Sequence, residues 1–256
     1  MKTIVFKGRT YPDVLELTIY PLPEVTFKDP EQGITARYIV AITSNKILVT
    51  VHSDIDVPTP TKEMLLLANR LVRNAVDLYC FQTGYVISTE LDRFVNPHGE
   101  DVYIVQHHKT LAARCRSFDA ITMRNMFLLA ATEQETFFAL YDLIVAVSVP
   151  EQAASNCAKV LDTIRNIVGP DMSERSAWAA LQSSLNAEPE YLRFITETSK
   201  RPRHGHRAYI GPDVLMKSLR RTWTMMDRLL EFKKRAAGAL PIGEFPLLRD
   251  ADPEQN

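Results

Sequence analysis

The chain has 256 residues, of which 46% are apolar and 24% are charged, and its formal net charge is −1. This length suits one large domain or two modest ones, and the composition is that of a folded protein rather than a disordered one. A net charge near zero excludes a uniformly basic protein that nucleic acid or a membrane would hold by bulk attraction. Any such partner needs a local patch.

The first half of the chain has the pattern of an α+β domain. Residues 36–42 and 46–51 are rich in β-branched side chains and flank Ser44-Asn45, which predicts a hairpin. Further strands are predicted at residues 15–19, 85–88 and 102–105.

One helix is predicted within this domain. Thr59 can cap a helix that begins at Pro60, and apolar residues at three- and four-residue spacing continue to Tyr79. We expect this helix to lie on the sheet. The strand pattern stops near residue 110, and we place the α+β domain at residues 1–125.

The second half of the chain has a helical pattern. We expect a five-helix bundle over residues 132–236, with Trp178 and Trp223 packed in its core, followed by a frayed tail over residues 237–256. The predicted helices begin near residues 132, 150, 174, 189 and 213.

The cysteines and apolar runs indicate the compartment. The three cysteines stand far apart without a C-x-x-C pair, which favours reduced thiols. Lys7 comes too early for a signal-like apolar run to precede it. The longest apolar stretch, about 137–149, contains Asp142 and is shorter than the roughly 20 residues of a membrane-spanning helix. We expect a cytoplasmic protein that does not enter a membrane.

Several common catalytic motifs are missing from the sequence. It has no G-x-G-x-x-G, Walker-type loop, H-E-x-x-H or G-x-S-x-G, so we expect no nucleotide cofactor and no zinc-protease activity. His107 and His108, with His98 and Cys115 nearby, are donors that a metal could use. Their spacing fits no ligand pattern, and adjacent residues on a strand point to opposite faces, so we expect surface imidazoles and no metal.

A basic segment with two histidines, residues 200–207, separates the fourth and fifth predicted helices. Arginine can hold phosphate charge, and imidazole can move a proton near neutral pH. From Lys200 to Arg235 the chain has eleven basic and three acidic residues, a pattern that a phosphate-bearing partner could recognise.

Within this segment, His206 follows Arg201 by five positions in a helical domain. This arrangement resembles the R-x4-H motif of the HEPN superfamily (higher eukaryotes and prokaryotes nucleotide-binding), over roughly residues 132–236. A second R-x4-H, from Arg93 to His98, lies in a strand and turn segment, where a site of this type is not expected.

The resemblance implies RNA binding or metal-independent RNA cleavage in a homodimer. His206 would be the general base or acid at the ribose 2′-hydroxyl and the leaving oxygen, and Arg201 would stabilise the phosphorane. Arg203, His204 and Arg207 would hold phosphate.

Two other classes of function stay open. In one, the protein is a non-catalytic dimerisation or interaction protein, and the basic segment caps the end of the fourth helix. In the other, it binds a small molecule between sheet and bundle. Pro202 is expected to force Arg201 into an extended or turn conformation, whichever function applies.

Overall fold

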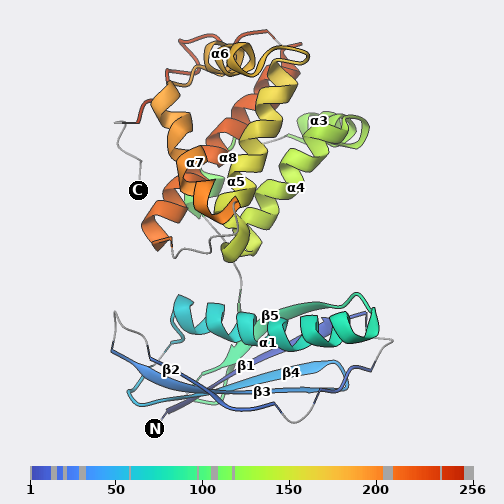
Figure 1. The fold of residues 1–256 in the computed structure, drawn as a ribbon, viewed down its shortest axis with the longest axis vertical. Coiled ribbons are helices and arrows are strands. Elements are labelled where there is room, and N and C mark those ends of the chain that lie inside the picture. Colours follow the sequence, from blue (N-terminus) through green and yellow to red (C-terminus); the bar gives the residue numbers. More distant parts are fainter. Residues whose placement is uncertain are drawn as a thin grey trace. The chain divides into compact units, whose positions relative to one another are not determined.

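The protein forms two compact units, Met1–His107 and His108–Asn256, and each unit has a hydrophobic core of its own (Figure 1). The structure is a computed structural model. It describes residues 2–12, 16–19, 22–28, 33–57, 59–96, 98–104, 109–116, 119–203, 210–236 and 238–250.

The N-terminal unit contains a six-stranded antiparallel sheet in the order β2-β3-β4-β1-β5-β6. The predicted hairpin is confirmed, because β3 pairs with β4 and the turn residues Ser44 and Asn45 both adopt positive φ angles, of 46° and 65°. The strands are β1 (Lys2–Tyr11), β2 (Val25–Lys28), β3 (Thr35–Thr43), β4 (Lys46–Ser53), β5 (Ser88–Val95) and β6 (Asp101–Tyr103).

The predicted helix is α1 (Lys62–Thr83), and it covers one face of this sheet. Its buried residues, from Met64 to Val76, follow the helical repeat and join the core of the sheet. The cap is Thr61 rather than Thr59: its hydroxyl accepts a hydrogen bond from the Met64 N–H at 3.2 Å, so the helix begins two residues after Pro60.

The strand prediction at residues 15–19 is wrong for the part that the structure describes, residues 16–19. The Leu17 N–H donates to the Asn45 side-chain oxygen at 2.6 Å, and Ile19 forms only an isolated bridge with Ile42. An asparagine side chain thus takes the place of a ladder partner. The strand β1 lies between β4 and β5.

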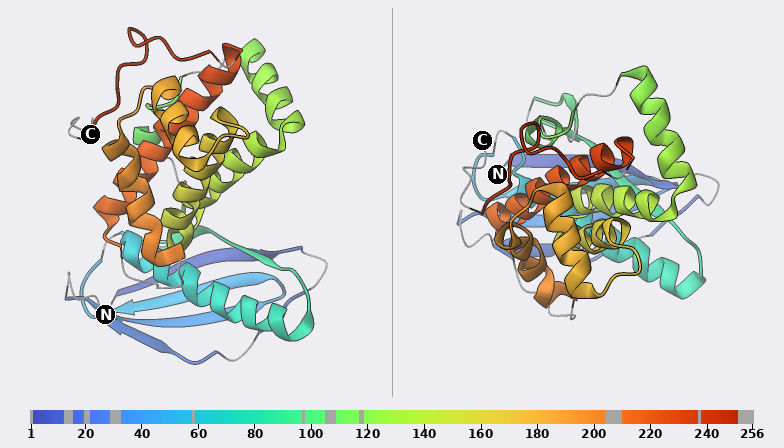
Figure 2. Two further views of the ribbon diagram at one scale, coloured as in Figure 1. Left: turned by 45° about the horizontal axis from the view of Figure 1, so that its top comes forward. Right: turned by 90° about the horizontal axis from the view of Figure 1, so that it is seen from above.

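The C-terminal unit is helical, which confirms the predicted helical bundle (Figures 1 and 2), and its last five helices, α4 to α8, correspond to the five that we predicted. The helices are α2 (Lys109–Ala112), α3 (Ala120–Thr132), α4 (Gln134–Ser148), α5 (Pro150–Val168), α6 (Glu174–Leu185), α7 (Pro189–Arg203) and α8 (Pro212–Lys234). The core lies around α5, which packs against α4, α6, α7 and α8. Among the described helices, none has the length and apolar character needed to cross a bilayer.

The helices α2 and α3 were not predicted. α3 is apolar around most of its circumference, so it lacks the periodic pattern that identifies an amphipathic helix. Its N-terminus is capped by Asp119, whose carboxylate accepts from the Thr122 N–H at 2.6 Å.

The segment 238–250, which we expected to fray, packs on the bundle. Leu240 and Phe245 are buried, each with 3% of its surface exposed. The Asn186 side-chain amide donates to the carbonyl oxygens of both residues, at 2.8 and 2.9 Å. Asn186 adopts φ 51° at the end of α6, a conformation that asparagine tolerates, and it ties this segment to the helix end.

Candidate functional site

The C-terminal end of α7 carries the described part of the predicted site. The helix continues through Pro202 to Arg203, so Arg201 is helical and not in the extended or turn conformation that we expected. A proline in the last turn withholds a single N–H, so the helix loses one main-chain hydrogen bond there. His204, His206 and Arg207 lie outside the described residues. The pairing of Arg201 with His206 therefore stays a prediction.

Arg203 lies at a cleft of about 580 Å³ between α5, α6 and α7. Arg201 is two residues earlier, which places it about 200° away around the helix, on a different face. The structure thus separates the two arginines that the sequence placed in one site. The cleft is lined by Asp162, Arg165, Glu174, Trp178, Gln182, Pro189, Leu192, Arg193, Thr196 and Arg203.

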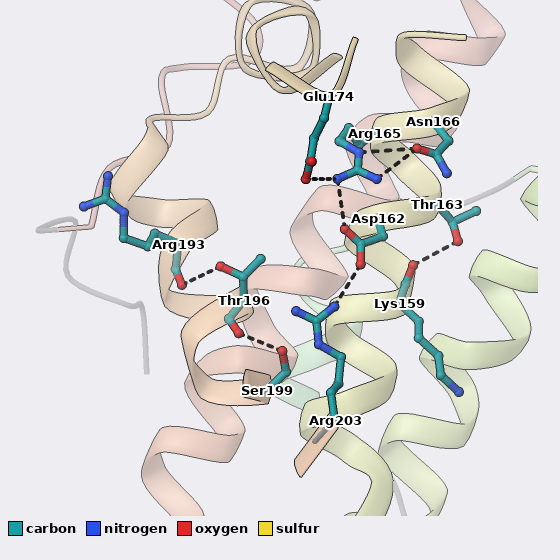
Figure 3. Close-up of polar contacts among 10 residues, drawn as sticks. All are labelled: Lys159, Asp162, Thr163, Arg165, Asn166, Glu174, Arg193, Thr196, Ser199 and Arg203. Carbon is teal, nitrogen blue, oxygen red and sulfur yellow. Dashed lines mark hydrogen bonds and ion pairs between the residues drawn. The ribbon is translucent and has the colours of Figure 1, made fainter. Parts of the chain in front are cut away.

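A chain of charged side chains crosses the cleft (Figure 3). Arg203 donates to one Asp162 carboxylate oxygen at 3.0 Å, and the Arg165 guanidinium lies 3.3 Å from the other. The same Arg165 nitrogen lies 3.3 Å from the Glu174 carboxylate. Because Asp162 lies between two arginines, its carboxylate orients both guanidinium groups.

Arg165 is the most fixed member of this chain. Only 17% of its side chain is exposed, and its guanidinium lies 5.1 Å from the centre of the Trp178 ring. It also donates two hydrogen bonds to the Asn166 side chain, at 3.2 and 3.3 Å. A guanidinium held by a carboxylate, an amide and an aromatic ring forms a rigid, positively charged wall.

Arg203 is held more weakly, and a ligand could recruit it. Arg203 and Asp162 are 36% and 34% exposed, and an ion pair of this kind contributes at most about 1 kcal/mol. A phosphate offers two oxygens to one guanidinium and forms stronger hydrogen bonds than a single carboxylate contact. Arg193, at the rim, is 63% exposed and faces away from Asp162 (Figure 3).

The basic residues of α8 do not form the continuous cationic face that their number suggested. Arg221 and Arg228 are only 2% and 5% exposed. Arg228 donates to the carbonyl oxygens of Leu185, Asn186 and Pro246, at 2.6, 2.7 and 2.6 Å. Burial lowers the pKa of Arg228 to about 10, so the side chain still carries its charge at neutral pH. Arg228 therefore holds the C-terminal segment against the end of α6.

Other cations near the end of the bundle are also paired. Arg221 contacts the Asp250 carboxylate at 2.7 Å, and Lys233 contacts Glu133 at 2.7 Å. The cleft therefore provides a better-defined place for a phosphate than α8 does.

The described residues contain no cluster of three or more metal-ligating side chains. Of the four donors considered from the sequence, His107 and His108 lie outside the described residues. Burial, and then the negative charge of Asp227, raise the pKa of the Cys115 thiol to about 11. Cys115 is therefore a protonated thiol at neutral pH and a poor metal ligand.

Sequence reasoning missed Asp162, Arg165 and Arg193. One signal was present, because Asp162 and Arg165 are three residues apart on a helix that was predicted correctly, and such residues share a face. The approach of α6 and its Trp178 to that face had no local signal in the sequence.

Two family models match the chain, one in each compact unit. The model described as Domain of unknown function (DUF8168) N-terminal domain matches residues 4–105, and its C-terminal counterpart matches residues 123–234. The chain belongs to the DUF8168 family. The DUF8168 C-terminal match contains α4 to α8 and every residue that lines the cleft. Neither model assigns the chain to the HEPN superfamily. No curated protein and no solved structure matches the chain.

Proposed function

We propose that the C-terminal unit binds RNA at the cleft between α5, α6 and α7, and that the bound strand continues around the end of α7 to Arg201 and His206, which cleave it without a metal. The observation that carries the proposal is the position of Arg203. This side chain lines an open cleft of about 580 Å³ and directly precedes the two histidines. A volume of this size suits a ligand as large as a nucleotide.

The chemistry of the cleft suits a phosphate-bearing strand. Its lining contains three arginines against two carboxylates, and one of the carboxylates, Glu174, is 78% exposed at the edge. Arg203 can exchange Asp162 for a phosphate at small cost, while Arg165 stays fixed against Trp178. RNA binding therefore requires the movement of one exposed side chain.

Cleavage would use groups from the segment that follows α7. In the proposed reaction His206 takes the proton from the ribose 2′-hydroxyl, and the 2′-oxygen forms a bond to phosphorus. The bond from phosphorus to the 5′-oxygen breaks, and a protonated imidazole returns a proton to that oxygen. Arg201 stabilises the negative charge on the phosphorane. The products are a 2′,3′-cyclic phosphate and a free 5′-hydroxyl.

A second function, that of a non-catalytic interaction protein, is favoured by a different observation. Many of the basic side chains between Lys200 and Arg235 pair with carboxylates or are buried, as Arg221 and Arg228 are. Side chains used in this way stabilise the bundle and need no nucleic acid partner.

The test is RNA cleavage in the presence of a chelator. We expect 2′,3′-cyclic phosphate ends from the parent protein and none from His206→Ala or Arg201→Ala. The matched control is His98→Ala, because Arg93 and His98 have the same spacing in the N-terminal unit, and this variant should cleave normally. Cleavage that survives in both His206→Ala and Arg201→Ala would contradict the assigned roles.

RNA binding separates the two functions if no cleavage is seen. Binding that weakens steeply with salt and with Arg203→Ala would support an RNA-binding protein without catalysis. A protein that neither cleaves nor binds RNA would contradict the RNA proposal and leave the interaction protein as the favoured function.

A further inference from the structure

The helices α3 and α4 expose an apolar surface that the rest of the C-terminal unit leaves uncovered. We define the α3–α4 face by six side chains, which are between 46% and 73% exposed: Ile121, Phe127, Leu128, Phe137, Phe138 and Tyr141. α3 has no buried residue, and its main helix contact is with α4 (Figure 2).

A helix with the sequence of α3 needs a cover on its outer side. Arg124 is its one charged residue, and its apolar side chains surround most of the helix. A helix that is apolar all round is normally buried, and a helix of 13 residues is marginal without tertiary packing. Its Met126 and Leu129 pack against the core of the C-terminal unit, which covers only one side of the helix.

The exposed area matches one side of a protein–protein interface. If a large apolar residue presents about 200 Å² when fully exposed, the six side chains together present about 700 Å². The largest apolar patch on a monomer is usually about 300–600 Å², and a stable interface buries about 800 Å² on each partner. Aromatic residues are enriched at the centre of such an interface.

The charges beside this face are complementary to one another. Arg124 lies between Ile121 and Leu128 on the outer side of α3, while Glu135 and Asp142 flank Phe138 on α4. Among the described residues, none of these three charges takes part in an ion pair. A face with a cation on one helix and anions on the other can bind its own copy across a two-fold axis, because each α3 then meets the α4 of the other chain.

We propose that the α3–α4 face is the surface through which two copies of this chain associate. A membrane surface is a poorer occupant, because interfacial helices that bind lipid carry several lysines and arginines, whereas this face has one basic and two acidic residues. The proposal is independent of the RNA site, because none of the residues that line the cleft belongs to α3 or α4.

Sedimentation of the full chain tests this proposal. We expect a dimer whose dissociation constant rises at least thirty-fold in Phe127→Glu, about the effect of losing one interface hot spot. The matched control is Phe81→Glu on α1, a phenylalanine that is 90% exposed in the other unit and should leave association unchanged.

Charge reversal adds a test of orientation. Arg124→Glu should weaken the dimer, and adding Glu135→Arg and Asp142→Arg in the same chain should restore it. Hydrogen exchange on the parent protein needs no variant: the amides of α3 should become more protected as concentration rises.

Three results would overturn the proposal. One is a parent chain that stays monomeric at about 100 µM, a concentration at which even a weak dimer forms. The second is a dimer that Phe127→Glu leaves intact. The third is a protection of α3 that does not depend on concentration, which would show that the chain's own N-terminal unit covers this face.

Discussion

Arg228 provides the sharpest test of the structural role assigned to the basic residues of α8. Its guanidinium is buried and donates to three main-chain carbonyl oxygens, those of Leu185 and Asn186 at the end of α6 and that of Pro246 in the C-terminal segment. Replacement by methionine keeps most of the side-chain volume and removes every one of these donors. The variant therefore separates hydrogen bonding from packing.

The expected loss of stability is about 4 kcal/mol. The Asn186 carbonyl oxygen still accepts from the Leu248 N–H at 2.8 Å in the variant, so the Leu185 and Pro246 carbonyl oxygens are the two that lose a donor without this compensation. A buried acceptor that loses its partner costs about 1–3 kcal/mol, which gives about 2–6 kcal/mol for two. Methionine also removes the desolvation cost of the buried guanidinium charge, so we expect a loss below the upper end of this range.

Urea unfolding followed by tryptophan fluorescence measures this loss. Both tryptophans, Trp178 and Trp223, belong to the C-terminal unit, so the signal reports that unit alone. The control is Lys234→Met on the same helix, which loses a half-exposed side chain paired with Glu231 and should change stability by less than about 0.5 kcal/mol. Arg228→Met should also expose the segment 238–250 to proteases. A variant within 1 kcal/mol of the parent, with this segment still protected, would refute the reasoning.

Three further predictions follow from single contacts. Asp162→Asn should raise RNA affinity up to about five-fold in a titration, because it frees Arg203 from an ion pair worth at most about 1 kcal/mol; weaker binding would mean that Asp162 contributes to the RNA site. Burial and the negative charge of Asp227 raise the pKa of the Cys115 thiol to about 11, and only the thiolate reacts with an alkylating reagent. Alkylation of Cys115, followed by peptide mass spectrometry, should therefore be slow at pH 8 and accelerate up to about pH 11. Asp227→Asn should speed the reaction at pH 8, and a rate that does not change with pH would contradict this prediction. A Cβ at Gly8 would lie 2.0 Å from the Glu90 carbonyl oxygen at a bulge of the sheet. Gly8→Ala should therefore destabilise the N-terminal unit by about 2–3 kcal/mol, as measured by urea unfolding followed by circular dichroism. Stability equal to that of the parent protein would show that the bulge relaxes easily.

Elements with a local periodic signal could be predicted from the sequence. The hairpin β3–β4 alternates buried and exposed side chains around a two-residue turn, and the long helices each bury one stripe. α3 escaped prediction because a helix that is apolar on nearly every side has no stripe. If its outer face binds a second copy, the missing pattern is itself a consequence of association.

Long-range contacts were beyond local sequence reasoning. The segment 238–250 has two prolines and no helical or strand pattern, yet Asn186 and Arg228 hold it through hydrogen bonds to carbonyl groups more than 15 residues away. The candidate site could not be predicted in full for the same reason, because burial depends on long-range contacts. A count of basic residues treats Arg228 and Arg203 alike, whereas folding buries the first and leaves the second at the cleft.

The salt dependence of RNA binding tests the central claim most directly. A side chain that contacts phosphate displaces counterions, so Arg203→Ala should weaken binding to all RNA sequences and lower the slope of log affinity against log salt by about 1. The control is Arg73→Ala on α1, a half-exposed arginine paired with Asp77 outside the cleft, and its slope should equal that of the parent protein. An unchanged slope in Arg203→Ala, or an equal loss in both variants, would contradict the proposed RNA site.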